Sequence, residues 1–241
     1  MRTAPAPRDE PPLAAAVRSA LAGVGDPGRA VAQQAYMKSA LPFRGLSNPE
    51  LRALLRPLLA DPALAPRDRE QWQATVRALW DEPEVREERY AAVAVTGHGA
   101  ARAWQDPGAL DLYRHLVSTG AWWDLVDPLA ADRVGPVLLT HRAAVDPVVR
   151  AWARDDDLWV RRTAVLAQLT HRGATDTDLL SDVLAANLED SLHGREFFVR
   201  KAVGWALRQY ARTDPDWVRS WVAAHEGRLS GLSRREALKH L

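Results

Sequence analysis

The segments Leu158-Trp-Val-Arg-Arg162, Phe197-Phe-Val-Arg-Lys201 and Gly231-Leu-Ser-Arg-Arg235 decide the fold of this 241-residue chain. Their basic pairs are 39 and 34 residues apart, and each pair is followed by small and aliphatic residues that continue a helix. This period is typical of HEAT-type helical hairpins, which bury their apolar faces by stacking on one another. The repeats therefore predict an all-α protein, a HEAT-like solenoid of stacked antiparallel helical hairpins. A more degenerate unit is predicted at Val85-Arg-Glu-Glu-Arg-Tyr90.

The rest of the chain also has a helical pattern. Apolar residues recur at i, i+3 and i+4 spacing from about Ala14 onward, and no run of alternating β-branched residues indicates a strand. The predicted helices are separated by Pro, Gly and Asp clusters, which are Gly25-Asp-Pro-Gly28, Leu46-Ser-Asn-Pro49 and Asp106-Pro-Gly108. Residues 1–12 contain four prolines and are predicted to be a disordered arm, and 13–241 to be a single domain.

The composition excludes several classes of site. The chain has no cysteine, which excludes disulfides, iron–sulfur clusters, cysteine-ligated zinc and thiol nucleophiles. Its seven histidines show no HExxH or paired-ligand spacing, and P-loop, GxGxxG and GxSxG motifs are missing. We therefore expect neither a metal nor a cofactor. No apolar run approaches the roughly 20 residues that cross a bilayer, and residues 1–10 lack the apolar core of a signal peptide. A cytoplasmic protein is expected.

Basic residues are unevenly distributed, although the formal net charge is only +1. From His193 onward there are ten Arg or Lys residues against five Asp or Glu. Equivalent positions of a solenoid line up on one face, so Arg162, Lys201 and Arg235 are predicted to form a basic stripe. Such a stripe is the electrostatic footprint of a protein that binds a phosphate backbone. The alternative is that each basic pair is an ordinary solvated surface feature.

The segment Gly120-Ala-Trp-Trp-Asp-Leu-Val-Asp127 is the densest cluster of chemically useful side chains. On a helix Trp123 and Asp127 lie at i and i+4 and share a face, while Trp122 and Val126 share another face that can point to the core. One of the two adjacent tryptophans is expected to face outward. The alternative is that Trp123 packs between repeats and Asp127 only stabilises the positive end of its helix.

A second cluster follows Glu196. Phe198, Lys201, Trp205 and Arg208 fall at i, i+3, i+7 and i+10, which predicts one helical stripe that alternates aromatic and cationic side chains. Rings and cations on one face suit a sugar–phosphate partner, although a structural face with snorkelling cations would look the same. Gly204 leaves space for the close approach of a neighbour or a ligand.

The acidic run Asp155-Asp-Asp157 resembles a metal loop only superficially. Because it directly precedes the helix predicted from Leu158, it is more simply explained as a helix N-cap.

Together these segments resemble the bacterial AlkD-type alkylpurine DNA glycosylases. The resemblance covers about 30–241 in order and without large gaps. Its segments are Ala35-Tyr-Met-Lys38, Arg77-Ala-Leu-Trp-Asp81, Ala121-Trp-Trp-Asp-Leu-Val-Asp127, Leu158-Trp-Val-Arg-Arg-Thr-Ala164, Glu196-Phe-Phe-Val-Arg-Lys-Ala-Val-Gly-Trp205 and Leu232-Ser-Arg-Arg-Glu-Ala-Leu-Lys-His240. It implies HEAT-like repeats with a concave DNA-binding face, and hydrolysis of the N-glycosidic bond of cationic N3- and N7-alkylated purines, notably 7-methylguanine and 3-methyladenine.

The resemblance also implies roles for individual residues. The family's catalytic carboxylate falls on Asp127, and the aromatic pair that flanks the backbone of the damaged nucleotide falls on Trp123 and Trp205. The basic residue that grips the backbone near the lesion falls on Arg162. None of these four is replaced, which disfavours a catalytically dead relative.

Three further positions match the family's DNA-facing residues, and one departs from its pattern. Phe197 and Phe198 match an aromatic pair, and Tyr36 matches a tyrosine near the DNA surface. The departure is Pro128, which restricts the backbone of Asp127 and, if it lies beyond the first helical turn, can kink the helix.

The chemistry of this reaction agrees with that set of residues. An alkylated purine already carries positive charge and needs no general acid to leave, while the sugar becomes oxocarbenium-like and is stabilised by negative charge and π density. Asp127 can stabilise that cation and orient the attacking water, the two tryptophans can offer ring faces, and Arg162 makes a carboxylate tolerable beside phosphates. No lysine lies at or beside the Asp127 position, which disfavours a Schiff-base lyase.

We therefore expect a monofunctional DNA glycosylase that acts on duplex DNA as a monomer, without an obligate protein partner, a membrane or base flipping. The alternative is a HEAT-like scaffold that binds nucleic acid or protein without catalysis. It explains the repeats and the basic stripe equally well, but not a carboxylate and two tryptophans beside them. An RNA-binding repeat protein would need a base-reading pattern in every repeat, which is missing here.

Overall fold

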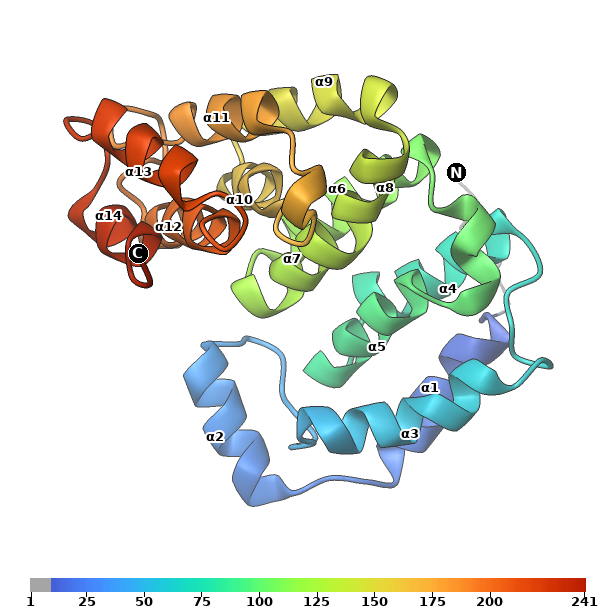
Figure 1. The fold of residues 1–241 in the computed structure, drawn as a ribbon. Helices are drawn as coiled ribbons and strands as arrows, with labels where there is room; N and C mark the ends of the chain where they lie inside the picture. Colours follow the sequence, from blue (N-terminus) through green and yellow to red (C-terminus); the bar gives the residue numbers. More distant parts are fainter. Residues whose placement is uncertain (1–9) are drawn as a thin grey trace, which may run out of the picture. The chain divides into compact units, whose positions relative to one another are not determined.

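The computed structural model describes residues 10–241, which form helices and no strand (Figure 1). The prediction of an all-α repeat protein is confirmed. The helices divide into two compact units at Trp104/Gln105. Residues 1–9 of the predicted arm lie outside the described residues, and Pro12 already begins the first helix. Within residues 10–241, no helix is long and apolar enough to span a membrane.

The N-terminal unit is built around α1, α3, α4 and α5, in which α1 and α5 each pack against the other three helices. Its helices are α1 (Pro12–Ala22), α2 (Pro27–Met37), α3 (Asn48–Ala60), α4 (Arg69–Asp81), α5 (Arg86–Thr96) and the 3-10 helix η1 (Gly99–Trp104). The predicted breaks at 25–28 and 46–49 are confirmed, because Asp26 caps α2 and Ser47 forms a capping box at α3.

Helix α2 differs from the other helices of this unit, because none of its side chains is buried. It is held by polar contacts: the Asp26 N–H donates to the Arg44 carbonyl over 2.8 Å, and Gln33 Nε2 donates to the Leu46 carbonyl, also over 2.8 Å. At Gly45, where φ is +85°, a Cβ atom would lie 2.1 Å from the Asp26 carbonyl oxygen, so only glycine permits this approach. A buried carboxylate, Glu87 of α5, accepts the N–H groups of Arg44 and Gly45.

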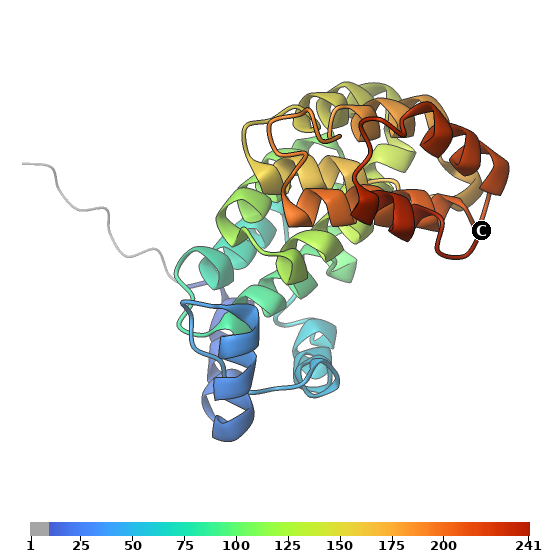
Figure 2. The ribbon, with the colours of Figure 1, turned by 90° about the vertical axis from the view of Figure 1, so that its left-hand side faces the viewer.

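The C-terminal unit is a stack of helical hairpins. Its helices are η2 (Pro107–Ala109), α6 (Leu110–Gly120), α7 (Trp123–Leu129), a π-helical turn η3 (Ala130–Val134), α8 (Gly135–Thr140), α9 (Arg142–Trp152), α10 (Leu158–Leu166), η4 (Arg172–Ala174), α11 (Thr177–Ala185), α12 (Phe197–Tyr210), α13 (Pro215–Ala224) and α14 (Gly231–Ala237). One layer contains α7, α10, α12 and α14 in contact with one another in that order, and α9, α11 and α13 cover it (Figures 1 and 2).

The three repeated segments each open a helix of the first layer. Leu158, Phe197 and Gly231 are the first residues of α10, α12 and α14. Asp157 caps α10 by accepting the N–H groups of Trp159 and Val160, which confirms the N-cap interpretation of the acidic run. Apolar side chains of α10 to α14 then share one core, so each hairpin is covered by its neighbour.

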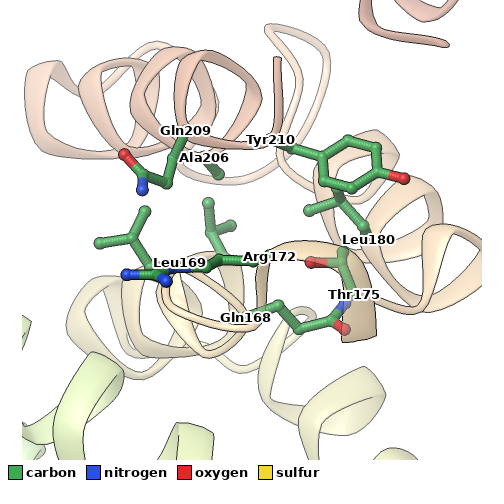
Figure 3. Close-up of a pocket in the computed structure, with 9 residues that line it drawn as sticks. Gln168, Leu169, Arg172, Thr175, Leu180, Ala206, Gln209 and Tyr210 are labelled. Carbon is green, nitrogen blue, oxygen red and sulfur yellow. The ribbon is translucent and has the colours of Figure 1, made fainter. Parts of the chain in front are cut away.

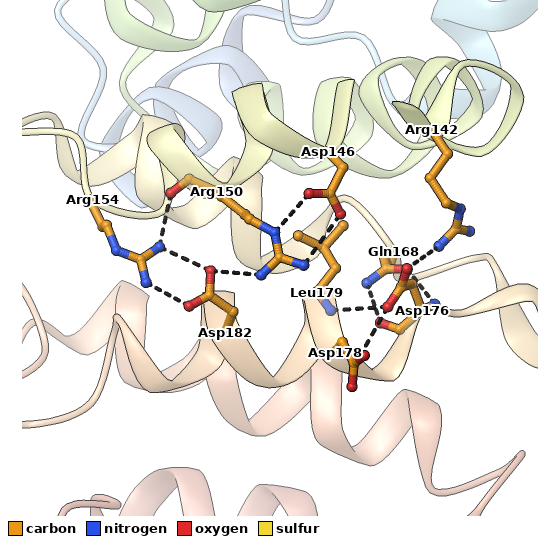
Figure 4. A network of polar contacts seen from close by, with 9 residues as sticks. All are labelled: Arg142, Asp146, Arg150, Arg154, Gln168, Asp176, Asp178, Leu179 and Asp182. Carbon is orange, nitrogen blue, oxygen red and sulfur yellow. Dashed lines mark hydrogen bonds and ion pairs between the residues drawn. The ribbon is translucent and has the colours of Figure 1, made fainter. Parts of the chain in front are cut away.

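Ion pairs join two helices of the covering layer, α9 and α11 (Figure 4). Arg150 lies between Asp146 of its own helix and Asp182 of α11, and Arg154 also binds Asp182. Arg142 binds Asp176, the N-cap residue of α11. These cations are therefore used to hold successive hairpins together.

Candidate active site

Four chemically important residues occupy the same position in successive helices of the first layer. Asp127, Arg162, Lys201 and Arg235 are each the fifth residue of their helix, in α7, α10, α12 and α14. Asp127 precedes Arg162 by 35 residues, which is about one repeat period. This register is the sequence signal that could have predicted that these two side chains meet.

Asp127 and Arg162 form a bidentate ion pair between α7 and α10. The Nε and Nη2 atoms of Arg162 each donate to one carboxylate oxygen of Asp127, both over 2.7 Å. The third nitrogen, Nη1, donates to the main-chain carbonyl of Phe198 at the start of α12. The side chain of Arg162 is only 4% exposed, and that of Asp127 is 15% exposed. The guanidinium of Arg162, on α10, therefore links α7 and α12 to its own helix next to the Asp127 carboxylate.

Burial and the ion pair act on Asp127 in opposite directions. Removal from water raises the pKa of Asp127 above its ordinary value, while the hydrogen bonds and the charge of Arg162 oppose the rise. A carboxylate that accepts two guanidinium hydrogen bonds is held as the anion. Each of its oxygens keeps a second lone pair for another donor, and the 15% exposure gives solvent access to it.

Pro128 lies beyond the first turn, as the sixth residue of α7. A π-helical turn, Ala130–Val134, directly follows the end of α7 at Leu129, and such turns occur where the regular hydrogen-bond ladder is interrupted. Two side chains after α10 bond to carbonyls of this region: Thr170 to Ala131 over 3.4 Å and buried His171 to Gly135 over 2.9 Å. The carboxylate of Asp127 is nevertheless within hydrogen-bond distance of Arg162, so the proline does not prevent this pairing.

An aromatic cluster lies around Phe198. The ring of Phe198 contacts Trp159 at 5.0 Å, Trp122 at 5.2 Å and Phe197 at 5.4 Å between centroids, and the Arg162 guanidinium lies 6.0 Å from it. Of the adjacent tryptophans Trp122 and Trp123, it is Trp122 whose ring packs in this cluster. Both tryptophans are half-buried. Sequence reasoning missed the contribution of Trp159 to this cluster, although Trp159 occupies the same position as Phe198 in the repeat alignment.

The predicted stripe on α12 is present. Phe198, Lys201, Trp205 and Arg208 are all half-buried on one face of the helix. Sequence reasoning missed Glu236 of α14, which bonds to both cations: Lys201 Nζ donates to Oε1 over 2.7 Å and Arg208 Nη1 donates to Oε2.

Gly204 permits this contact between α12 and α14. A Cβ atom at Gly204 would lie 2.5 Å from the Cβ atom of Glu236 and 2.9 Å from the Ser233 carbonyl oxygen. The expected close approach is therefore made by a neighbouring helix.

The prediction of a basic surface stripe through Arg162, Lys201 and Arg235 is wrong for Arg162. Its guanidinium is buried because α7 and α12 cover both sides of α10 and supply its partners. Lys201 is half-exposed but paired, and Arg235 is exposed. Their roles toward DNA stay predictions.

Two predicted DNA-facing aromatic residues are exposed. Tyr36 lies on α2 of the N-terminal unit and is 74% exposed, and Phe197 at the first position of α12 is 52% exposed.

A separate small cavity lies between α10, α11 and α12 (Figure 3). Its lining includes Gln168, Arg172, Gln209 and Tyr210, and its volume is about 10 Å³, which suits a single water molecule and is too small for a purine base. In residues 10–241, no group of three or more His, Asp or Glu side chains is arranged to hold a metal ion.

Comparison with known proteins gives the family. The model of the DNA alkylation repair enzyme family matches residues 17–241. A solved structure of a predicted DNA alkylation repair enzyme from Enterococcus faecalis superposes with a TM-score of 0.78 and is 29% identical, over 90% of this chain and 97% of that one. No curated protein sequence matches the chain. The match over nearly the whole chain means that this protein belongs to the DNA alkylation repair enzyme family and has a role in DNA repair.

Proposed function

We propose that this repair enzyme is a monofunctional DNA glycosylase. It hydrolyses the N-glycosidic bond of cationic N3- and N7-alkylated purines, such as 3-methyladenine and 7-methylguanine, in duplex DNA. It acts as a monomer, without base flipping, a metal or a cofactor. The observation that supports this proposal best is the partly exposed Asp127 carboxylate, held as the anion by the buried guanidinium of Arg162.

An anion at this position suits the reaction. The alkylated base leaves with the electrons of the glycosidic bond and needs no proton, so positive charge develops on the sugar. A fixed carboxylate stabilises that charge, and its free lone pairs can orient the water that attacks the sugar carbon. Because Asp127 is already desolvated and bonded in the free protein, little reorganisation is needed.

Two tryptophans complete the proposed site. Trp123 is one helical turn before Asp127 on α7. Trp205 is on the face of α12 that begins at Phe198, whose carbonyl binds Arg162. Their ring faces would flank the sugar and stabilise positive charge on it. Lys201 and Arg208 on either side of Trp205 would bind the neighbouring phosphates.

A non-catalytic scaffold is the second candidate, and the same ion pair is the observation in its favour. A carboxylate bound on both oxygens by a buried arginine also holds helices together, and this role alone would explain the Asp127–Arg162 pair. The two candidates differ in whether Asp127 is needed for base release.

The deciding experiment measures release of free 7-methylguanine from methylated duplex DNA. The test variant is Asp127→Asn, and the control is Asp132→Asn, the same change at an exposed position five residues along. We expect the control to match the wild type, and the Asp127 variant to bind duplex DNA but to lose at least about 100-fold in rate, as when an electrostatic stabiliser is removed.

A second variant covers the case in which Asp127→Asn fails to fold. Trp123→Ala leaves the ion pair intact and is expected to reduce release by at least about ten-fold, because one ring face is lost. Folding of both variants is checked by thermal unfolding. Wild-type rates in both folded variants, or no release by the wild type despite DNA binding, would instead support the scaffold.

A further inference from the structure

Glu236 is the one acidic side chain in the described part of the chain that binds cations of the α12 stripe. It joins Lys201 and Arg208, which are four residues before and three residues after Trp205 on the same face of α12. Each carboxylate oxygen takes one cation. A phosphodiester would bind the same two cations in this way, one on each non-bridging oxygen.

The two cations keep capacity for another ligand. Lys201 uses one of its three N–H donors on Glu236, and Arg208 uses one of its five. The Lys201 side chain is 41% exposed and that of Arg208 is 24% exposed, whereas that of Glu236 is only 15% exposed. The carboxylate therefore lies beneath a cationic surface that solvent or a ligand can reach.

Electrostatics makes Glu236 a charged partner throughout the neutral range. The Lys201 hydrogen bond, followed by the charges of Lys201 and Arg208, lowers the pKa of Glu236 below its ordinary value. An ionised carboxylate cancels about one of the two positive charges that the stripe would otherwise present to DNA.

The docking of α14 on α12 does not depend on this carboxylate. Ser233 Oγ donates to the Arg200 carbonyl over 2.8 Å, and the backbone of Ser233 lies against Gly204. Ala237 is fully buried in the shared core. Removing the charge of Glu236 therefore leaves the helix–helix contact in place.

We propose that Glu236 is an internal substitute for a phosphate of the DNA backbone. In the free protein its carboxylate holds Lys201 and Arg208 in position on either side of Trp205. When duplex DNA binds, a backbone phosphate takes the place of this carboxylate as the acceptor for N–H groups of both cations. The exchange of one anion for another weakens binding to DNA in general, so that the protein leaves undamaged sites more readily. This inference rests on the proposed function only in taking duplex DNA as the ligand.

The test compares the affinity of two variants for an undamaged duplex across a salt series. Glu236→Gln removes the internal anion, and Glu226→Gln is the control, because Glu226 forms an exposed ion pair with Arg234 and its loss changes the net charge equally. We expect Glu236→Gln to bind about 3- to 10-fold more tightly than the control at 50 mM salt, with a log–log salt slope steeper by about one.

A multiple variant assigns the gain to the two cations. When Lys201 and Arg208 are both changed to Gln, the further change Glu236→Gln is expected to give no gain in affinity. The melting temperature of each variant is measured alongside. A folded Glu236→Gln variant that binds no more tightly than the Glu226 control overturns the inference, as does a gain that persists without the two cations.

The outcomes are separable from those of the glycosylase assay. Binding to undamaged DNA requires no base release, so tighter binding by Glu236→Gln would stand even if no 7-methylguanine were released. Conversely, release that depends on Asp127 together with unchanged binding by Glu236→Gln would reject this inference and leave the proposed function intact.

Discussion

Arg162 binds both carboxylate oxygens of Asp127 across one repeat, with Nε and Nη2 each 2.7 Å from an oxygen. Both residues are the fifth of their helices, so the pair links equivalent positions of neighbouring helices, α7 and α10. The same guanidinium reaches the Phe198 carbonyl on α12. The position of the proposed catalytic carboxylate is thus fixed by the stacking of the repeats.

Arg162→Ala is expected to destabilise the fold strongly. The substitution leaves Asp127 largely buried without its counter-ion, which costs about 3–5 kcal/mol. The control Arg219→Ala breaks an exposed pair with Asp216 and is expected to cost about 0–1 kcal/mol. Chemical denaturation of both variants measures the free energy of unfolding. Equal losses would mean that the Asp127–Arg162 pair contributes no more than a surface contact.

Base release should depend on pH through Asp127. Burial raises the pKa of Asp127 above the ordinary 3.8, so the anion is lost at a higher pH than for an exposed aspartate. The single-turnover rate is expected to fall as the pH drops through this raised pKa. The effect of this group on stability has the opposite sign. A raised pKa stabilises the folded state at pH values below the ordinary pKa of 3.8, and this contribution is lost as the pH rises through the raised pKa of the folded protein. A rate that stays flat down to pH 3.8, the ordinary pKa of an aspartate, would contradict the role of Asp127.

Gly204→Ala should separate α14 from α12. The added Cβ atom meets Glu236 at 2.5 Å and the Ser233 carbonyl at 2.9 Å, and overpacking of this kind costs about 1–3 kcal/mol. Gly227→Ala is the control, because a Cβ atom there meets nothing within 4 Å. Thermal unfolding is measured for both variants, and Gly204→Ala is expected to have the lower melting temperature. Similar melting temperatures would show that α12 and α14 can move apart without a loss of stability.

Glu236 should stabilise the fold only while it is ionised. Lys201 and Arg208 lower its pKa below 4.5, so its contribution is complete above the unfolded value and is lost as the pH falls through the folded one. The difference in unfolding free energy between wild type and Glu236→Gln is expected to be about 1 kcal/mol or less at pH 7 and to vanish in acid. A difference that stays constant while the Glu236 carboxylate is protonated in acid would point to packing instead of charge.

Helix boundaries could be read directly from the sequence. The breaks at 25–28 and 46–49 and the helix start at Leu158 are where the sequence places them, and the other two repeated segments also open helices, at Phe197 and Gly231. The reason is local: capping residues such as Asp157 and Ser230 bond to backbone N–H groups two or three residues away, so a few neighbouring residues define each start.

Partners between helices could not be read in the same way. Sequence reasoning placed Arg162 on the surface and did not consider Glu236 or Trp159 as partners, because local patterns compare residues within one helix. The repeat register shows which residues are equivalent, but not how deeply a neighbouring helix buries them. A helical face is visible in the pattern of apolar residues, but the neighbour that covers that face is not.

The sequence by itself determined that this protein is a helical repeat stack, where its helices begin, and which residues occupy equivalent positions. Tertiary structure alone decided which of those equivalent residues are buried, paired or exposed. Arg162 is buried because α10 has α7 on one side and α12 on the other, Lys201 is paired with Glu236 of α14, and Arg235 stays exposed on the last described helix. Basic residues at equivalent positions thus have different environments, because each helix has a different place in the stack. The helices on either side determine how far a side chain is removed from water and which partner it binds.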